Sequence, residues 1–259
     1  MLLGILAACS KRETTVKLLK PGTPWENSLG MRFVPVSGTP VMFSVYETRV
    51  RDFEPFRTET NLEWIGADVE QAPDHPVANV TWEDANGFCA WLTQRERLQR
   101  ALGPGQRYRL PTDAEWSLAA GVAGEIGATP ADRELSTPVQ YVWGTAWPPP
   151  HGAGNFSGEE SDADRGEERT FVQGYRDPYP RLAPVGQFKP NVFGLHDLAG
   201  NLLEWCEEWH DATHRGRVAR GGAWLSGDAR TLAATHRAEI PSRAGLDVTG
   251  FRCVLEVGR

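Results

Sequence analysis

The sequence predicts an α+β fold with a small, irregular sheet, short helices and many loops. Its 259 residues include 27 Gly and 19 Pro, which are spread along the chain and favour turns and short elements. The 10 Trp residues can build a core of large rings that holds irregular backbone together. No stretch after residue 25 has the composition of a linker, so we expect a leader and tether over residues 1–24 and one domain over residues 25–259.

The first elements follow from patterns at the start of this domain. Residues 33–36 and 41–46 are rich in Val, Phe and Tyr and flank a Ser-Gly-Thr sequence, which predicts a short hairpin. Residues 50–60 predict a helix, although Pro55 in its interior opposes one. The chain should therefore open with a hairpin followed by a short helix.

Two further helices carry N-terminal capping signals. Thr81 and Asp84 predict the start of a helix whose apolar residues recur on one face to about residue 102. Thr112 and Glu115 form a capping box that predicts a second helix, ended by the glycine at position 121. Asp113 and Glu115 are also candidates for an acid–base pair, but capping explains Glu115 better.

The remainder of the chain predicts loops followed by short strands. Residues 122–190 are rich in loop-forming residues, and the charged insert over residues 158–169 is typical of a solvated loop. Three apolar segments, residues 217–223, 232–240 and 249–257, predict strands.

Charge and hydropathy limit the classes of partner. The net charge is −7 and the isoelectric point is near 5.5, which disfavours nucleic acid. No apolar run approaches the roughly 18 residues that a membrane-spanning helix needs. We therefore expect a protein or peptide, or a small ligand of unknown identity, as the partner.

The N-terminus carries a possible export signal. Residues 6–9, Leu-Ala-Ala-Cys, resemble a bacterial lipobox, which predicts lipidation of Cys9 and attachment to a bacterial membrane outside the cytoplasm. The apolar run is short and no Lys or Arg precedes it, so a short apolar leader or a wrongly chosen start codon is the alternative. Residues 10–24 are polar and basic and are typical of a tether.

The segment over residues 191–209 combines two sharp turns with two carboxylates, Asp197 and Glu204, and two tryptophans, Trp205 and Trp209. A tight loop that presents its own carbonyl groups beside paired carboxylates is typical of a site for a hard cation. The segment is therefore the first candidate for a metal site.

Four stretches in order, residues 75–92, 109–116, 194–209 and 220–253, resemble the sulfatase-modifying factor, or formylglycine-generating enzyme, family. The resemblance covers the chain from about residue 25 to residue 257. It implies a C-type-lectin-like fold with a low content of regular secondary structure.

The resemblance also implies up to two Ca²⁺ sites, each with four oxygen ligands of the kind that hard cations prefer. The first would use the Asp197 and Glu204 side chains with the carbonyls of Gly200 and Leu202. The second site would use the Asn155 and Asp177 side chains with the carbonyls of Phe156 and Tyr179. The alternative is that Asp197 and Asp177 only cap turns, by accepting hydrogen bonds from backbone N–H groups.

The chain departs from the family at the catalytic position. The family's enzymes oxidise a substrate cysteine with two copper-binding cysteines, and counting back from Arg237 places Ala229 and Ala234 there. Residues 221–252 contain no cysteine, so we expect neither copper nor formylglycine-generating activity. Cys89 and Cys253 match family positions that can form a disulfide, with two buried thiols as the alternative.

Three functional hypotheses follow. The first is a binding or scaffold module whose groove is lined by Trp209, Trp224, His236 and Arg237, although each tryptophan alone is better explained as a core ring. The second is an oxidoreductase of the same superfamily, of the sulfatase-maturation or non-heme-iron type. The candidate iron ligands are His196, His210, His214 and His236, but isolated surface histidines explain these residues better. The third is a diversity-generating variable protein, but residues 225–240 lack the Asn-rich composition typical of that class.

Overall fold

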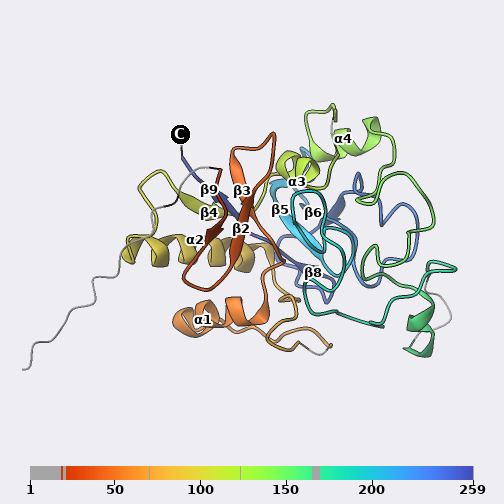
Figure 1. The fold of residues 1–259 in the computed structure, drawn as a ribbon, viewed down its shortest axis with the longest axis horizontal. Coiled ribbons are helices and arrows are strands. Elements are labelled where there is room, and N and C mark those ends of the chain that lie inside the picture. Colours follow the sequence, from red (N-terminus) through yellow and green to blue (C-terminus); the bar gives the residue numbers. More distant parts are fainter. Residues whose placement is uncertain (1–18, 20–21, 70, 123, 165–169, 259) are drawn as a thin grey trace, which may run out of the picture.

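The computed structural model describes residues 19, 22–69, 71–122, 124–164 and 170–258 (Figure 1). Cys9 and most of the expected tether lie outside the described residues, so lipidation and the domain boundary stay predictions. Among the described helices, none is both long enough and apolar enough to cross a membrane.

Two small sheets organise the chain. The first has the order β1-β2-β3-β9-β4, with bounds Trp25–Glu26, Arg32–Pro35, Val41–Ser44, Val254–Glu256 and Arg107–Arg109. The second has the order β7-β6-β5-β8, with bounds Ala238–Ile240, Arg217–Arg220, Leu203–Trp209 and Thr249–Gly250. β5 and β8 are parallel, and every other neighbouring pair is antiparallel.

The predicted hairpin is confirmed, because β2 and β3 pair antiparallel with Val34 opposite Phe43. The predicted strand over residues 249–257 divides between the two sheets, as β8 and β9. Only the last three residues of the segment 232–240 form a strand, β7. The residues before β7 instead form turns, one of which is closed by the bond from the His236 amide to the Ala233 carbonyl.

The helices are α1 (Val50–Thr60), α2 (Trp82–Leu98), α3 (Asp113–Ala119) and α4 (Pro130–Ser136), with one 3₁₀ turn over Glu159–Asp164. α1 includes Pro55 in its interior, as expected. The predicted capping boxes at Thr81 and Thr112 are present. In Figure 1, α1 and α2 lie beside the first sheet, and α3 and α4 lie near β5 and β6.

Two details of the helices differ from the sequence-based expectation. α2 ends at Leu98 and not near residue 102, because Arg100 adopts a left-handed φ of 60° and the Ala101 amide bonds the Glu96 carbonyl. α4 was expected as loop, although its start has a signal: Thr129 caps it, with Asp132 at the capping-box position.

The main core lies between α2 and the two sheets and is rich in rings. Phe53, Phe88 and Phe251 have ring centroids 5.5–6.3 Å apart and are fully buried. Trp205 of β5 joins the same cluster, and its indole N–H donates to the Val80 carbonyl. Trp205 is therefore a core ring that fixes β5, which in turn positions the loop before it.

Candidate functional site

The loop before β5 is held in an unusual backbone conformation. Asp197, Gly200 and Asn201 all have positive φ, at 58°, 80° and 59°. A Cβ on Gly200 would lie 2.1 Å from the Asn155 carbonyl oxygen, so only glycine fits there. Asn155 and Gly200 form a parallel bridge, and the Asn201 amide donates to the Asn155 carbonyl at 2.9 Å. The fold thus places Asn155, from the second predicted calcium site, directly beside the loop of the first.

Three buried carboxylates, Glu47, Asp197 and Glu204, lie at this loop, and Arg252 pairs with one of them. Arg252 donates to both oxygens of Glu204, at 2.5 and 2.7 Å, and all three carboxylates are less than 7% exposed. The third carboxylate, Glu47, was not predicted; it accepts from the Leu202 amide at 3.0 Å and from the Asn201 side chain at 2.7 Å. Glu47 therefore holds the loop from 154 positions away in sequence.

Burial, together with the excess of negative charge, perturbs these groups. Burial, with the charges of Asp197 and Glu204, raises the pKa of Glu47 well above its ordinary value. Burial also raises the pKa of Asp197 to about 6. Carboxylates with raised pKa values in one place indicate a position that favours an added cation, whether a proton or a metal ion.

The second predicted site contains a buried polar atom without a partner. Asn155 is fully buried; its amide nitrogen donates to the Arg181 carbonyl and to Asn201, but among the described residues its Oδ1 has no hydrogen-bond partner. A buried acceptor without a partner costs about 1–3 kcal/mol. Burial raises the pKa of nearby Asp177 to about 7, with a further contribution from Glu160. An oxygen ligand and a desolvated carboxylate of this kind fit a hard cation.

Turn capping, the alternative for the two aspartates, also occurs. Asp197 accepts from the Gly186 amide at 2.7 Å, and Asp177 accepts from the amides of Tyr179 and Phe156 at 2.8 and 3.1 Å. These bonds do not compete fully with a metal, because each carboxylate oxygen has a second lone pair. The carbonyl of Phe156 already accepts the Gly158 amide at 2.9 Å.

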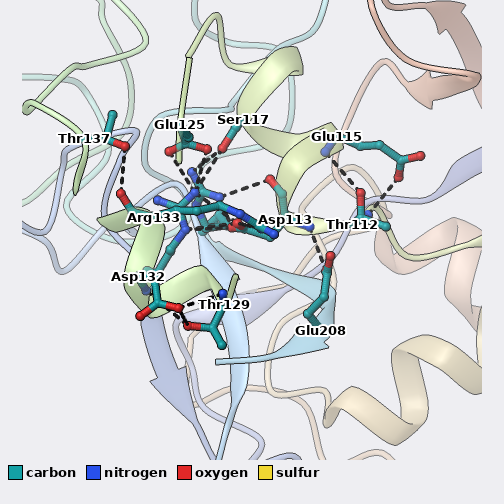
Figure 2. A network of polar contacts seen from close by, with 12 residues as sticks. Thr112, Asp113, Glu115, Ser117, Glu125, Thr129, Asp132, Arg133, Thr137 and Glu208 are labelled. Atoms are coloured by element: carbon teal, nitrogen blue, oxygen red, sulfur yellow. Dashed lines mark hydrogen bonds and ion pairs between the residues drawn. The ribbon is translucent and has the colours of Figure 1, made fainter. Parts of the chain in front are cut away.

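A second buried cluster surrounds α3 (Figure 2). The Asp113 carboxylate, which is fully buried, contacts Arg133, Arg220 and Arg237. Burial alone would raise the pKa of Asp113, but the charges of Arg220 and Arg237 outweigh it and hold the pKa below its ordinary value. Glu125 pairs with Arg237 at 2.7 Å. This cluster is a structural ion-pair network.

The neighbouring carboxylate Glu115 is the capping residue that the sequence indicated. It accepts from the Thr112 amide at 2.8 Å and pairs with Arg109 at 2.7 Å. Asp113 and Glu115 therefore each have their own arginine partners, and neither is placed as a free acid or base.

The four predicted groove residues occupy separate environments. Trp209 stacks on His214 and on the Arg217 guanidinium, which lies 3.7 Å from its ring centroid. Trp224 is only 7% exposed and packs in a small core cluster. His236 bonds Glu134, and Arg237 lies in the buried network of Asp113. Because Arg237 and Trp224 are buried, the groove proposed from the sequence is not formed by these side chains.

A different hollow adjoins the candidate calcium loop. Its volume is about 230 Å³. It lies between residues 142–153 and residues 189–199, and its lining includes Trp143, His151, Lys189 and Asp197. Trp143 is held by a parallel stack on Tyr141, with ring centroids 4.7 Å apart. No local pattern in the sequence predicts this hollow, because its two walls come from loops about 40 residues apart that only tertiary packing brings together.

The two alanines that the family resemblance predicts at the copper-binding positions lie in different environments. Ala234 is 1% exposed, and its methyl group belongs to a core cluster with Trp116 and Cys206. The Ala234 amide donates to the Gln140 carbonyl, and its carbonyl accepts from Arg220. Ala229 is half-buried.

The cysteines and histidines are distributed as follows. Cys89 and Cys253 are free thiols with sulfur atoms 3.4 Å apart, so the disulfide stays a prediction, and Cys206 is a buried free thiol. Among the described residues, no two of the four candidate iron-binding histidines join a carboxylate in a metal-like cluster, so the predicted iron site is not assembled. Only His210 lies in such a cluster, with Asp211 and Glu239.

Comparison with known proteins assigns the family. A model of the sulfatase-modifying factor enzyme 1-like domain matches residues 27–257, so the chain belongs to this family. It is 30% identical over 204 residues to a Bos taurus protein named inactive C-alpha-formylglycine-generating enzyme 2, covering 75% of this chain and 54% of that protein. It is 28% identical over 214 residues to the formylglycine-generating enzyme of Thermomonospora curvata, covering 74% and 59%.

A third relative is the chaperone protein LppX of Paenibacillus barcinonensis. The two sequences are 27% identical over 208 residues, and the match covers 69% of this chain and 66% of LppX. The chain thus spans little more than half the length of the first two relatives, at 54% and 59%.

Two solved structures share the fold. PvdO from Pseudomonas aeruginosa aligns with a TM-score of 0.61 at 18% identity, covering 92% of this chain and 99% of PvdO. Treponema denticola variable protein 1 aligns with a TM-score of 0.54 at 18% identity, covering 90% and 98%. The predicted α+β fold of the formylglycine-generating enzyme type is confirmed.

Proposed function

We propose that this chain is a calcium-stabilised binding module of the sulfatase-modifying factor family that lacks formylglycine-generating activity. The observation that carries the proposal is that residues 229 and 234, where the family resemblance predicts a pair of copper-binding thiolates, are both alanines. Alanine has no donor atom for Cu(I), and Ala234 is packed in the core in a cluster with Trp116 and Cys206.

The relatives support a non-catalytic role without deciding it. One relative is named as inactive and another as a chaperone, whereas others are named as formylglycine-generating enzymes. Because the chain matches only part of their length, the activity and partners of any whole protein remain part of the proposal.

Calcium is supported by two features of the described residues. The loop before β5 buries Glu47, Asp197 and Glu204 against Arg252, and Asn155 presents an unpartnered Oδ1 beside it. Hard cations take oxygen ligands of this kind. When bound, Ca²⁺ supplies positive charge and fixes the loop; the chain's own residues set the loop's backbone through Gly200 and Glu47.

The hollow between residues 142–153 and 189–199 is the proposed ligand site, because it borders Asp197 and presents both Trp143 and Lys189. Such a combination of a flat apolar ring and charged groups suits a peptide or a small polar ligand with an apolar part. We further propose that the module acts outside the cytoplasm, attached through Cys9.

Metal content is the first test. Protein purified without chelators is analysed by mass spectrometry for calcium, copper and iron. We expect one or two equivalents of calcium, reduced in Asp177→Ala and in Asp197→Ala, and no copper or iron. Stoichiometric copper or iron in the wild-type protein would overturn the proposal.

Activity is the second test. A cysteine-containing sulfatase peptide is incubated with copper-loaded protein and analysed by mass spectrometry, with an established formylglycine-generating enzyme as the positive control. We expect the peptide to stay unmodified. Conversion to formylglycine by the wild-type chain would show that the two alanines do not stand at the catalytic positions.

A further inference from the structure

We propose that His210, Asp211 and Glu239 form a metal site of a different class, which binds a divalent transition ion such as Zn²⁺. The three residues lie at the end of the second sheet, where β5 turns into β6 beside β7. One ligand atom from each lies within 4.8 Å of the others. The site uses one imidazole and two carboxylates, and it shares no residue with the candidate calcium ligands.

The imidazole nitrogen that faces the carboxylates has no hydrogen bond. His210 Nδ1 is buried and, among the described residues, is without a hydrogen-bond partner. It lies 3.7 Å from Asp211 Oδ2 and 3.8 Å from Glu239 Oε2, which is too far for a hydrogen bond. Two ligands bound to one Zn²⁺ at about 2.1 Å are separated by about 3.4 Å at the tetrahedral angle, and these separations correspond to roughly 120–130°. The spacing therefore suits atoms bridged by a metal better than atoms bonded to each other.

The Asp211 carboxylate is anchored through its other oxygen. Asp211 Oδ1 accepts from the Thr213 amide at 2.7 Å and from the Thr213 hydroxyl at 2.5 Å, which leaves Oδ2 facing His210. Glu239 Oε1 faces Arg215 at 3.8 Å, which leaves Oε2 facing His210. Hydrogen bonds such as those to Asp211 Oδ1 orient a ligand before a metal binds, because they fix the rotation of its carboxylate.

The backbone around the imidazole is also fixed. The His210 amide donates to the Gly216 carbonyl at 2.9 Å, and the His210 carbonyl accepts from Ala131 of α4 at 3.1 Å. A Cβ on Gly216 would lie 2.6 Å from Glu239 Cγ, so glycine at this position lets the turn approach β7 closely. The side chains of His210, Asp211 and Glu239 are 16%, 25% and 30% exposed, so the site is reachable from solvent.

The donor set selects the class of ion. Imidazole suits Zn²⁺ and its first-row neighbours, whereas Ca²⁺ takes oxygen ligands alone. Three protein ligands on an accessible edge leave a fourth position for water or for a group from a partner. The bound ion would join the β5–β6 turn to β7 and to the start of α4.

Binding of Zn²⁺ alone tests the proposal. Isothermal titration is carried out on untagged, chelator-treated full chain in excess calcium, so that the candidate calcium sites are occupied. We expect one Zn²⁺ per chain, and at least about tenfold weaker binding in His210→Ala and in Glu239→Gln. His214→Ala is the matched control, because His214 lies in the same turn but stacks on Trp209; it should bind as the wild type does.

Cobalt substitution identifies the ligands independently. Co²⁺ bound at this site should show visible d–d absorption without a thiolate charge-transfer band, since no cysteine is among the ligands. Circular dichroism of each variant confirms that it is folded. The proposal is overturned if the wild type binds no Zn²⁺, if His210→Ala binds as well as the wild type does, or if a thiolate band appears.

Discussion

The two buried clusters of carboxylates in this molecule differ in how their charge is balanced. Asp113 beside α3 contacts three arginines, and its pKa is lowered in spite of burial. Around the loop before β5, Glu47, Asp197 and Glu204 are buried with Arg252, and burial raises the pKa of Glu47 and Asp197. A buried carboxylate is thus balanced by arginines in the first cluster, whereas the carboxylates of the second cluster outnumber the positive charges beside them.

Burial of a carboxylate does not by itself identify a metal site. A buried carboxylate that has arginine partners is satisfied within the chain, whereas an excess of carboxylates favours an added proton or metal ion. This difference is the physical basis of the proposed calcium site, and it can be tested by changing one cluster at a time.

The largest effect is expected at the balanced cluster. Asp113→Asn removes the counter-ion of Arg220 and Arg237, whose side chains are fully buried, and should cost about 3–5 kcal/mol in the free energy of unfolding. Urea unfolding monitored by tryptophan fluorescence measures this loss. Asp197→Asn in calcium-free buffer is the matched variant; because it relieves repulsion, it should leave stability unchanged or raise it. Similar losses in the two variants would contradict the comparison.

The next effect concerns the backbone of the unbalanced cluster. Gly200→Ala places a Cβ against the Asn155 carbonyl at a positive φ, and we expect a loss of about 3 kcal/mol or more. Gly194→Ala, in the same segment and at a φ of 81°, meets no atom within 4 Å and should cost about 1 kcal/mol. Equal losses in thermal unfolding would show that the close approach to Asn155 does not constrain the loop.

The dependence of stability on pH should distinguish the candidate calcium sites from the cluster of Asp113. Asp177 has an ordinary pKa of 3.8 that burial raises to about 7 in the fold, so the metal-free folded state binds more protons than the unfolded state over this range. The stability of metal-free protein should therefore fall as pH rises from about 4 to about 7. Saturating calcium should reduce or reverse this slope, since the metal binds the deprotonated carboxylates.

Thermal unfolding between pH 4 and pH 7, with and without calcium, measures this slope. Asp177→Asn should reduce the dependence of metal-free stability on pH. Asp132→Asn is the control, because its Thr129 hydrogen bond lowers the pKa of Asp132 and places its titration below this range. A metal-free stability that rises with pH, or a slope unaffected by Asp177→Asn, would contradict the prediction.

The smallest effect is expected at the surface. Arg51 and Asp74 form an ion pair at 2.7 Å, but their side chains are 49% and 59% exposed. Asp74→Asn should change stability by less than about 0.5 kcal/mol, because water screens the pair. A loss approaching that of Asp113→Asn would show that burial does not set the energetic difference between ion pairs in this fold.

The elements that could be predicted from the sequence are those with local signals. The capping boxes at Thr81 and Thr112 and the hairpin of β2 and β3 are written in adjacent residues, and the structure contains them. The segment 232–240 was predicted as a strand from its composition, but the Arg220 bond to the Ala234 carbonyl belongs to a turn packed against α3. The bond between Arg220 and Ala234 joins residues 14 positions apart, so no pattern of adjacent residues predicts it.

The candidate site divides in the same way. Asp197 and Glu204 were identified because a tight loop with carboxylates is visible in the sequence, whereas Asn155 and Asp177 were implied by the family resemblance. The role of Glu47 and the cluster of His210 with Glu239 were not identified, since each depends on a pairing of distant segments.

The sequence by itself determined the family and the local helix and turn signals, and it predicts that two alanines replace the family's copper-binding cysteines. The tertiary structure decided which charged groups are buried together and which have partners. It placed Trp209 and Trp224 in different environments, buried Arg237 against Asp113, and left Asn155 Oδ1, beside the carboxylates, without a partner among the described residues. The physical reason is that the cost of burying a charge depends on its neighbours in space, which only the folded chain specifies.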